Sequence, residues 1–600
     1  MKLSDYVFDF IAGLGVKHVF LLTGGGAMHL NDSLGQNRQL EFVCNLHEQA
    51  SAMAAETYAK ATGDLGVALV TTGPGGTNTV TGVAGAWLDS TPCLFISGQV
   101  KRPDLKGKTG VRQMGVQEVD ITAIVGPITK YAALVMEPET IRYHLEKAVH
   151  LARTGRPGPV WIDIPLDVQA ATIDPDTLKG FEPEVETPTV PDAKLKEQVA
   201  QVIALLNASE RPVILAGNGI RLARATPDFL DLLTLLNVPV MATWLAVDLI
   251  PYERDLFLGR PGTVAPRGTN FALQNSDFLL TVGSRIDFTI TGYAPERLAR
   301  AAKRVLVDVD PAELGKLEKY ATLSICADAG AFIRELMAQR DSIKARDRSP
   351  WLDRCREWKE KYPIVQDEHR KPDQLVSTYY LGEILSEELK ENEMIVSGSS
   401  GAGIEIFQHA LRMKAGQRLF HTTALGSMGY GLPAAIGACL GAGRRETICV
   451  DGDGGFQMNI QELATVQRLN LPIKFFVLNN DGYSSIRTSQ QRWFGRNMGA
   501  DHTSGMTLPD LSKVAAAYGV PTARIENQRD LRAQIRAVLD TPGPVVCDVV
   551  SLPEEARMPS LASAQRKDGS MFSKPLEDLW PFLEREEFLA NMIIPPVPED

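Results

Sequence analysis

Short apolar runs recur along the 600-residue chain, and most of them end in a turn rich in glycine or polar residues. Near the N-terminus, residues 19–22 lead into Thr23-Gly24-Gly25-Gly26, residues 67–70 lead into a second glycine turn, and residues 160–165 form a third run. Apolar runs of this length, followed by helical patterns, predict buried parallel strands with helices on both faces of the sheet. Ligands of such sheets bind at the carboxyl ends of the strands.

Six hundred residues exceed what one hydrophobic core usually organises, so several domains are expected. The pattern of apolar runs and helices recurs in three blocks, which agrees with that expectation. Residues 171–195 are rich in Pro, Glu, Thr and Asp and predict a linker, and the charged residues 341–361 predict a helical connector. The fold class predicted is α/β, with three doubly wound parallel-sheet domains. The predicted limits are 1–175, 190–340 and 370–555, with a C-terminal tail at 556–600. Further strands are expected at 212–217, 278–283, 305–310, 394–396, 447–450 and 473–478.

The composition argues against a nucleic-acid-binding, secreted or membrane protein. The chain is 44% hydrophobic and has a net charge of −11, so it has no basic excess to neutralise a nucleic-acid backbone. Its first residues lack a signal-peptide pattern, and its apolar runs are too short for a bilayer. The seven cysteines are scattered without a CxxC pair, which favours free thiols in a reducing compartment. We therefore expect a cytoplasmic protein that binds neither nucleic acid nor membrane.

The most informative motif is Asp451-Gly452-Asp453-Gly454-Gly455, followed downstream by Asn479-Asn480. Each part follows an apolar run, at 447–450 and 473–478, so Asp453 and Asn480 are expected at the same edge of one sheet. A carboxylate and an amide oxygen suit Mg²⁺, which takes few ligands from protein and the rest from water and phosphate. Gly454 and Gly455 leave their backbone N–H groups accessible at the start of a helix, where an anion is favoured. Asp-Gly and Asn-Asn are also common turn dipeptides, so each part alone could be structural.

This segment resembles the metal–diphosphate motif of thiamine diphosphate enzymes. Residues 1–555 as a whole resemble the acetolactate synthase branch, in the order pyrimidine-binding, central and diphosphate-binding domain. The resemblance implies a homodimer or homotetramer, and Mg²⁺ held by the side chains of Asp453 and Asn480 and the carbonyl of Gly482. A second diphosphate loop is implied at 397–403, although the family usually carries Gln and His side chains at positions 402 and 403. The resemblance implies coenzyme-binding residues in the loop 397–403 and in the metal–diphosphate motif. They are Ser400, Gly401, Gly403, Gly452, Gly454, Gly455, Gly482 and Tyr483.

Glu48 stands just after a short apolar run, at the start of a helix rich in small residues. Alone, an acid in a first helical turn is usually only a favourable partner of the helix dipole. In the family, the Glu of this His-Glu-x-Ala context bonds N1′ of the coenzyme's aminopyrimidine and activates the coenzyme. That chemistry needs one buried carboxyl group with a raised pKa that faces an apolar ring. The resemblance therefore implies Glu48 as the activating residue.

Residues 424–433 are similar to the family segment in which a large apolar side chain wedges between the rings of the coenzyme. The resemblance implies Met428 as that wedge, and the carbonyl of Gly426 as an acceptor for the 4′-amino group. A methionine in a glycine-rich turn is, by itself, more often a core residue. The loop 73–78 resembles a family loop near the coenzyme, and the coenzyme-binding residues expected in the first domain are Gly26, Gly75 and Asn78.

Two further side chains are candidates for the substrate. Residues 115–118 resemble the family's Ala-Phe-Gln-Glu segment, so Gln117 is expected to donate to the substrate carboxylate or carbonyl. His29 follows the first glycine turn and could point at the same pocket, although a lone histidine is more often structural.

Several positions depart from the family pattern. Val116 stands where the synthases have Phe, Ser489 where they have Trp, Thr289 where they have Arg, and Arg260-Pro261 where they have Met-His. The replacement of Phe and Trp by Val and Ser opens volume, and the loss of the Arg at position 289 removes a partner for a carboxylate. We predict a carboligase of the transferase class that decarboxylates a 2-keto acid, pyruvate, and transfers the two-carbon unit to a keto acceptor. The acceptor is expected to be bulkier or less acidic than a simple keto acid, such as a ketone on a nucleotide-linked deoxysugar, because residues 573–588 look like those of carboligases that make branched sugars.

The central block resembles the flavin-binding domain of the synthases at residues 215–219, 283–287, 308–310 and Asp328. FAD is expected there in a structural role, although related enzymes leave this domain empty or bind ADP. Three alternatives stay open. The first is a decarboxylase, lyase or C–C hydrolase acting on a diketone. The second is a redox enzyme that reduces FAD and then a quinone, with residues 576–588 touching a membrane. The third is a non-enzymatic paralogue, against which intact Glu48, Asp453 and Asn480 count.

Overall fold

The computed structural model describes residues 1–183, 192–399, 401–565 and 569–598. The chain forms two compact units. The first contains Met1–Val185, Glu393–Ile404 and Arg418–Glu554, and the second contains Glu186–Asn392, Glu405–Gln417 and Glu555–Asp600. The first unit holds two six-stranded parallel sheets, and the second holds a five-stranded parallel sheet. The prediction of an α/β fold built on three parallel sheets is confirmed.

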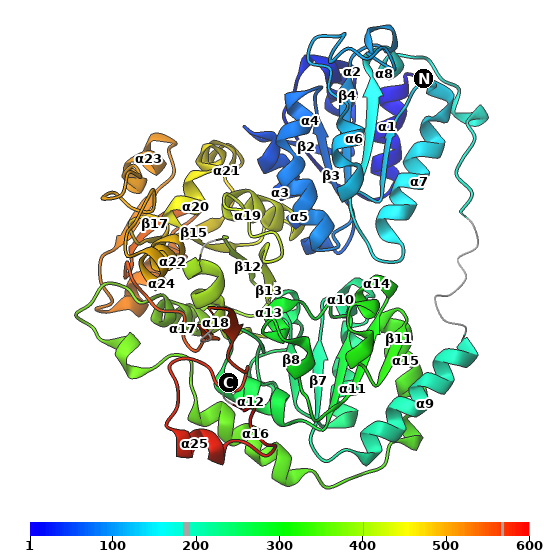
Figure 1. Ribbon diagram of the computed structural model, residues 1–600. Coiled ribbons are helices and arrows are strands. Elements are labelled where there is room, and N and C mark those ends of the chain that lie inside the picture. Colours follow the sequence, from blue (N-terminus) through cyan, green and yellow to red (C-terminus); the bar gives the residue numbers. More distant parts are fainter. Residues whose placement is uncertain (184–191, 400, 566–568, 599–600) are drawn as a thin grey trace. The chain divides into compact units, whose positions relative to one another are not determined.

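The first sheet has the strand order β2-β1-β3-β4-β6-β5. Successive side chains of its strands point alternately into two apolar layers, one on each face of the sheet. Val19 and Leu21 pack with helices α1 and α7, whereas Phe20 between them packs with α3, and Figure 1 shows these helices on opposite faces. The elements are α1 (Leu3–Gly13), β1 (His18–Leu21), α2 (Met28–Gln36), β2 (Glu41–Cys44), α3 (Glu48–Thr62), β3 (Gly66–Val70), α4 (Pro74–Asn78), α5 (Val80–Leu88), β4 (Cys93–Gln99), α6 (Ile121–Val125), β5 (Tyr131–Leu134), α7 (Ile141–Arg153), β6 (Val160–Pro165) and α8 (Leu166–Gln169).

The other sheet of this unit repeats the same topology, with the order β13-β12-β14-β15-β17-β16. In both sheets the chain reverses its direction of travel between the first and third strands, which is where open α/β sheets bind ligands. The elements are β12 (Met394–Ser397), β13 (Arg418–Phe420), α19 (Gly431–Gly441), β14 (Thr447–Gly452), α20 (Asp453–Gln457), α21 (Leu463–Leu469), β15 (Ile473–Asn479), α22 (Ser484–Phe494), α23 (Leu511–Ala517), β16 (Thr522–Ile525), α24 (Leu531–Asp540) and β17 (Val545–Val550).

Small residues join the two halves of the first unit. Helix α3 lies beside α19 (Figure 1). A Cβ atom on Gly437 would lie 2.1 Å from the carbonyl oxygen of Ala54, and one on Gly441 would lie 2.8 Å from the Cβ of Ala61. Larger side chains would push the helices apart, so the small-residue composition of α3 serves a close helix–helix contact.

The central sheet, in the second unit, has the order β11-β10-β9-β7-β8, an arrangement known from nucleotide-binding folds. Its reversal of direction lies between β7 and β9, so its ligand site is expected at the turns after those strands. The main elements of this unit are α9 (Asp192–Ala208), β7 (Pro212–Ala216), α11 (Thr226–Leu236), β8 (Val240–Ala242), α12 (Arg267–Asn275), β9 (Phe278–Val282), α13 (Phe288–Thr291), β10 (Lys303–Asp308), α14 (Pro311–Gly315), β11 (Leu323–Cys326), α15 (Ala329–Ala338), α16 (Ser349–Lys361), α17 (Thr378–Glu388) and α18 (Gln408–Ala410).

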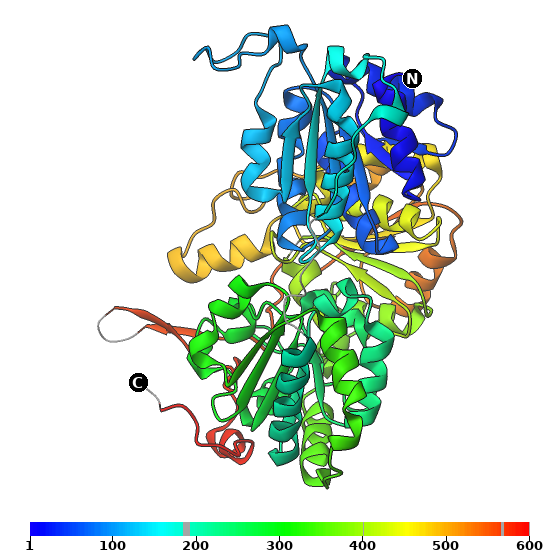
Figure 2. The same ribbon diagram turned by 90° about the vertical axis from the view of Figure 1, so that its right-hand side faces the viewer.

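The C-terminal segment belongs to the second unit. It forms a two-stranded antiparallel sheet of β18 (Ser563–Gln565) and β19 (Met571–Ser573), visible in Figure 2, and a short helix α25 (Arg585–Ala590). Leu576 and Phe588 are buried in the core of this unit together with Trp351 and Trp358. Leu576, Leu579 and Phe588 therefore serve the fold, whereas Trp580 and Phe582 of the same segment are exposed. Among the described residues, no helix has the length and hydrophobicity needed to cross a bilayer.

Candidate functional site

Two glycine-containing loops meet where the first sheet changes direction. Gly26 donates its N–H to Oγ1 of Thr71 at 3.1 Å, and a Cβ atom on Gly26 would lie 1.9 Å from Oγ1 of Thr72. A Cβ atom on Gly75 would lie 2.8 Å from Cγ2 of Thr71. Both glycines are needed for the close packing of the loops after β1 and β3, because a Cβ atom at either position would clash with a threonine side chain.

Glu48 is the first residue of α3 and is 7% exposed. Its Oε2 atom accepts a hydrogen bond from Nδ2 of Asn78 at 2.9 Å. His47 caps the helix, since its Nδ1 accepts from the N–H of Gln49 at 3.0 Å. No described residue hydrogen-bonds to Oε1 of Glu48 in addition. The structure thus brings two predicted residues together and orients the carboxyl group with one oxygen still available.

Gln117 lies beside this loop. It is exposed, has a φ of +66°, and its carbonyl oxygen would be 2.4 Å from a Cβ atom on Gly73. The neighbouring Glu118 is buried and accepts from the N–H groups of Lys106 and Met114, which holds the loop in place. Gln117 therefore stands next to the segment that carries Asn78.

His29 lies in the first turn of α2 and is partly exposed. Within the described part of the chain, no hydrogen bond joins it to Glu48, Asn78 or Gln117. Asn78, and not His29, is therefore the hydrogen-bond partner of Glu48 in the described residues.

Asp453 and Asn480 lie at the same edge of the third sheet, as the sequence predicts. The Oδ2 atom of Asp453 accepts from the N–H groups of Asn480 at 3.2 Å and Gly482 at 3.0 Å, and Oδ1 accepts from Gly454 at 2.7 Å. Burial raises the pKa of Asp453 to about 6, although these three donors favour the charged form. Asn480 is 5% exposed, and its Oδ1 has no hydrogen-bond partner among the described residues. A buried amide oxygen without a partner is costly and indicates that a ligand completes it.

The backbone around these residues is shaped for close approach. Gly482 has a φ of +108°, which favours glycine, and a Cβ atom there would lie 2.5 Å from the carbonyl oxygen of Ala500. A Cβ atom on Gly454 would lie 2.3 Å from the ring of Tyr483. Among the described residues, no group of three or more His, Cys, Asp or Glu side chains is placed to hold a metal ion. The available oxygens are therefore one carboxylate, one amide and backbone carbonyls, a set that suits a cation shared with phosphate and water.

Two buried charged residues here were missed by the sequence analysis. Arg487, on α22, donates to the carbonyl oxygens of Asn480, Asp481 and Pro553 at 2.7–2.8 Å, which holds the turn after β15. Asp451 is buried, and its carboxyl group occupies the space that Cβ atoms on three neighbouring glycines would need. Burial raises the pKa of Asp451 to about 7. An acid at the end of an apolar strand could have indicated Asp451, whereas an arginine in a helix carries no comparable signal. The three glycines are Gly398, Gly431 and Gly455.

The loops after β12 and β13 form the remaining part of the site. Ser397 Oγ donates to the carbonyl oxygen of Gly403 at 2.9 Å, and Gly401 begins a short π-helical segment. Ser400 lies outside the described residues. Gly426 has a φ of +67°, and a Cβ atom on it would lie 3.8 Å from Oγ of Ser399, so the two loops are neighbours. Gly452 is the last residue of β14 and leads into Asp453.

Met428 is 37% exposed, so it is not a filled core position. The next residue, Gly429, accepts from Nδ2 of Asn459 at 2.7 Å, and the same amide donates to Oε1 of Gln49 at 3.0 Å. Gln49 follows Glu48. One side chain, Asn459, thus ties the Met428 loop to the start of the helix that carries Glu48.

Glu462 strengthens this connection. Its carboxyl group is fully buried and accepts from the N–H groups of Leu46 and His47 and from Nδ2 of Asn45, at 2.8–3.1 Å. Burial raises its pKa, and these donors oppose that shift. No motif indicated Asn459 or Glu462, because their partners are about 400 residues away in the sequence.

The positions that depart from the family pattern fall into both units. Val116 is 87% exposed and Ser489 is exposed, and both belong to the unit that contains Glu48. Thr289 and Arg260 belong to the other unit. Thr289 donates its N–H to the side chain of Asp287, whereas Arg260 is 3% exposed.

Comparisons with known proteins agree with this arrangement. Three family models match: the N-terminal thiamine pyrophosphate-binding domain of thiamine pyrophosphate enzymes at residues 1–124, the central domain at 199–336, and the C-terminal thiamine pyrophosphate-binding domain at 401–549. Thiamine pyrophosphate is another name for thiamine diphosphate.

Relatives extend over most of the chain. Acetolactate synthase 1, chloroplastic, of Nicotiana tabacum is 35% identical over 94% of this chain and 83% of its own length. The probable acetolactate synthase large subunit of Methanocaldococcus jannaschii is 33% identical over 93% of both chains. Acetolactate synthase, chloroplastic, of Arabidopsis thaliana is 32% identical over 94% of this chain and 83% of its own. The chain is therefore a thiamine pyrophosphate-dependent enzyme, a carboligase of the transferase type that belongs to the acetolactate synthase family.

Proposed function

We propose that the enzyme decarboxylates pyruvate and transfers the resulting two-carbon unit to a keto acceptor, with Mg²⁺ as its metal. The observation that carries this proposal is the buried Glu48 carboxyl group, which is hydrogen-bonded to Asn78 and joined through Gln49 and Asn459 to the Met428 loop. We likewise propose a cytoplasmic homodimer or homotetramer whose three domains are residues 1–175, 190–340 and 370–555, with a C-terminal tail at 556–600.

Asp453, Asn480 and the carbonyl of Gly482 would hold the metal. Support comes from the buried Oδ1 of Asn480, which lacks a partner among the described residues, and from the three N–H groups that keep the Asp453 carboxylate in position. The glycine turn of 452–455, together with Gly401 and Gly403, would bind the diphosphate through backbone N–H groups.

Thiamine diphosphate, when bound, supplies an electron sink that makes loss of CO₂ from a 2-keto acid possible. Glu48 would hold a proton at Oε1, because Oε2 already accepts from Asn78. Met428 offers an exposed apolar side chain against which the coenzyme can pack. Gln117 would donate from its side-chain amide to the substrate carboxylate or carbonyl oxygen. His29 is a second candidate for the same role, although no hydrogen bond joins it to Glu48, Asn78 or Gln117 in the described part of the chain.

The acceptor is proposed to be bulkier or less acidic than a simple 2-keto acid. Val116 and Ser489 are smaller than the aromatic residues of the family at these positions, and both side chains are exposed. Thr289 stands where the family has Arg, so the positive charge that would favour a second carboxylate is absent at that position. A ketone on a nucleotide-linked deoxysugar is an acceptor of this kind.

Product analysis with carbon-labelled pyruvate tests the proposal. We expect slow turnover with pyruvate alone and at least about tenfold faster ligation when a ketone or ketosugar is added, because the small side chains of Val116 and Ser489 leave room for a larger acceptor. Mass detection of the labelled product is the measurement. Fast formation of acetolactate from pyruvate alone would refute the altered acceptor, and release of aldehyde without ligation would favour a decarboxylase.

We also propose FAD in the central domain. Support comes from the 2-1-3-4-5 type of strand order and from the glycine turns after β7 and β9, where the carbonyl oxygen of Gly283 would be 2.0 Å from a Cβ atom on Gly217. This contact also explains those two glycines without a ligand, so the strand order carries more weight. We expect flavin absorbance in the supernatant after the purified enzyme is denatured. If no flavin is released, the central domain binds ADP or no ligand, and the FAD proposal is wrong.

A further inference from the structure

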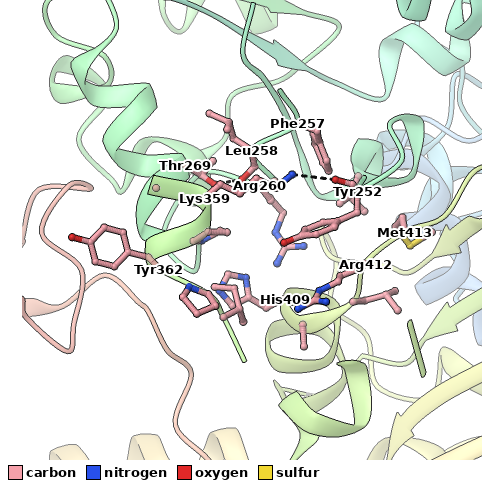
Figure 3. A pocket seen from close by; sticks show the side chains of 18 of the residues that line it. Tyr252, Phe257, Leu258, Arg260, Thr269, Lys359, Tyr362, His409, Arg412 and Met413 are labelled. Atoms are coloured by element: carbon pink, nitrogen blue, oxygen red, sulfur yellow. Dashed lines mark hydrogen bonds between the residues drawn. The ribbon is translucent and has the colours of Figure 1, made fainter. Parts of the chain in front are cut away.

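A cavity of about 470 Å³ lies within the second unit, among residues of the loop after β8, helix α16 and helix α18 (Figure 3). The turns directly after β7, β9 and β10 do not contribute to its lining.

Arg260 is the buried charge of this cavity. It is 3% exposed, and its guanidinium carbon lies 3.3 Å from the centroid of the Trp244 ring. Its Nε and Nη2 atoms have no hydrogen-bond partner among the described residues. Burial lowers the pKa of Arg260 to about 9, and the more distant Glu405 only partly opposes this. Glu405 is itself engaged by Arg557 at 2.6 Å. An unpaired buried cation is costly, so the site is built for a counter-ion.

Two neutral polar side chains also line the cavity without partners. Gln408 is 3% exposed and has no hydrogen bond at either amide atom, and His409 is 8% exposed and has none at Nε2, within the described part of the chain. In Figure 3, Arg260 and His409 come from different segments and face the same hollow. Burial, together with the charge of Arg260, lowers the pKa of His409 well below its usual value, so its imidazole is neutral. Three groups able to hydrogen-bond an oxyanion thus converge.

The other charges of the lining are already engaged or exposed. Arg356 is paired with Asp255 at 2.7 Å, and Arg412 contacts Glu383 at 3.2 Å. Lys359 donates to the carbonyl oxygen of Tyr252. The two remaining lining acids, Glu253 and Glu360, are exposed. The buried part of the cavity therefore has one unpaired positive charge, which matches an anion of charge −1.

We propose that this cavity binds a small organic monocarboxylate, with its carboxylate on Arg260, Gln408 and His409. A guanidinium group is well suited to a planar carboxylate, to which it can donate two parallel hydrogen bonds. Phe257, Leu258 and Met413 line the same cavity and provide an apolar wall for the body of the ligand. A phosphate dianion would leave an uncompensated negative charge in this buried position.

Isothermal titration of the full-length enzyme, loaded with coenzyme and metal, with benzoate and its neutral isostere benzamide tests the proposal. We expect benzoate to bind once per chain and benzamide at least tenfold more weakly. Arg260→Met should weaken benzoate binding about 10- to 100-fold, since it removes a charge-assisted hydrogen-bonding group. Arg334→Met, which changes an arginine whose side chain is 60% exposed in the same unit, should leave the affinity unchanged.

Thermal unfolding separates loss of the site from loss of the fold. Because Arg260→Met removes an unpaired buried charge, its midpoint without benzoate should be higher than that of the unchanged enzyme. Benzoate should raise the midpoint of the unchanged enzyme but not that of Arg260→Met. Gln408→Leu, which keeps the cation, should weaken benzoate binding to a smaller extent. Equal benzoate affinity in Arg260→Met, equal affinity for benzamide, or tighter binding of inorganic phosphate would each overturn the proposal.

Discussion

Glu48→Gln is expected to reduce kcat for pyruvate by at least about 10²- to 10⁴-fold, the range in which a positioned proton-transferring group usually contributes. The glutamine keeps the shape of the side chain and can still accept from Nδ2 of Asn78. It cannot hold and release a proton at the second oxygen. The measurement is kcat at saturating coenzyme and metal, together with the affinity for the coenzyme by titration calorimetry, which should change little.

Glu139→Gln is the matched control, because Glu139 is an exposed acid in the same half of the first unit. Its kcat should stay within about twofold of the unchanged enzyme, as is usual for surface substitutions. If Glu48→Gln retained turnover similar to that control, the assignment of Glu48 as the activating residue would be wrong.

Asp453→Asn is expected to weaken Mg²⁺-dependent binding of thiamine diphosphate by at least about 100-fold, more than the loss of an outer partner of a metal ligand usually costs. Three backbone N–H groups point at the two oxygens of this carboxylate. An amide nitrogen in place of one oxygen would face one of these donors, and the charge that favours the metal would be lost. Titration of the coenzyme at several Mg²⁺ concentrations measures the effect.

Excess coenzyme and metal should partly restore the turnover of Asp453→Asn. No concentration of coenzyme or metal should restore the turnover of Glu48→Gln. This difference separates a binding residue from a residue needed for chemistry. Asp341→Asn, at an exposed position of the second unit, serves as the control. Unchanged coenzyme affinity over the whole Mg²⁺ series would contradict the metal assignment.

Features encoded in short segments were predicted well. The run 473–478 became β15 (Ile473–Asn479), and the helix expected after residue 44 begins at Glu48. Each depends on neighbours in the sequence, since the length of an apolar run and the turn residues that bound it favour a buried strand over a helix. The meeting of Asp453 with the Asn480 turn was also predictable, because two adjacent parallel strands end at the same edge.

The polar connections within the site could not be predicted. Glu462 binds the backbone before Glu48, and Asn459 joins Gln49 to the loop of Met428. These contacts join residues about 400 positions apart, and neither residue belongs to a periodic pattern or a recognisable motif. Arg260 was noticed as a departure from the family, but only its burial beside Trp244, His409 and Gln408 suggests an anion site.

The sequence by itself determined the kind of chemistry. Its glycine turns and the pair of Asp453 and Asn480 indicate a metal-bound diphosphate, because both follow strands expected to be neighbours, and the family resemblance adds Glu48. The tertiary structure decided which of these groups face one another. Asn78 rather than His29 hydrogen-bonds to Glu48, because the segment after β3 places the Asn78 amide beside the carboxyl group. Side-chain partners depend on how distant segments pack, and that information is spread over the whole chain rather than over any motif.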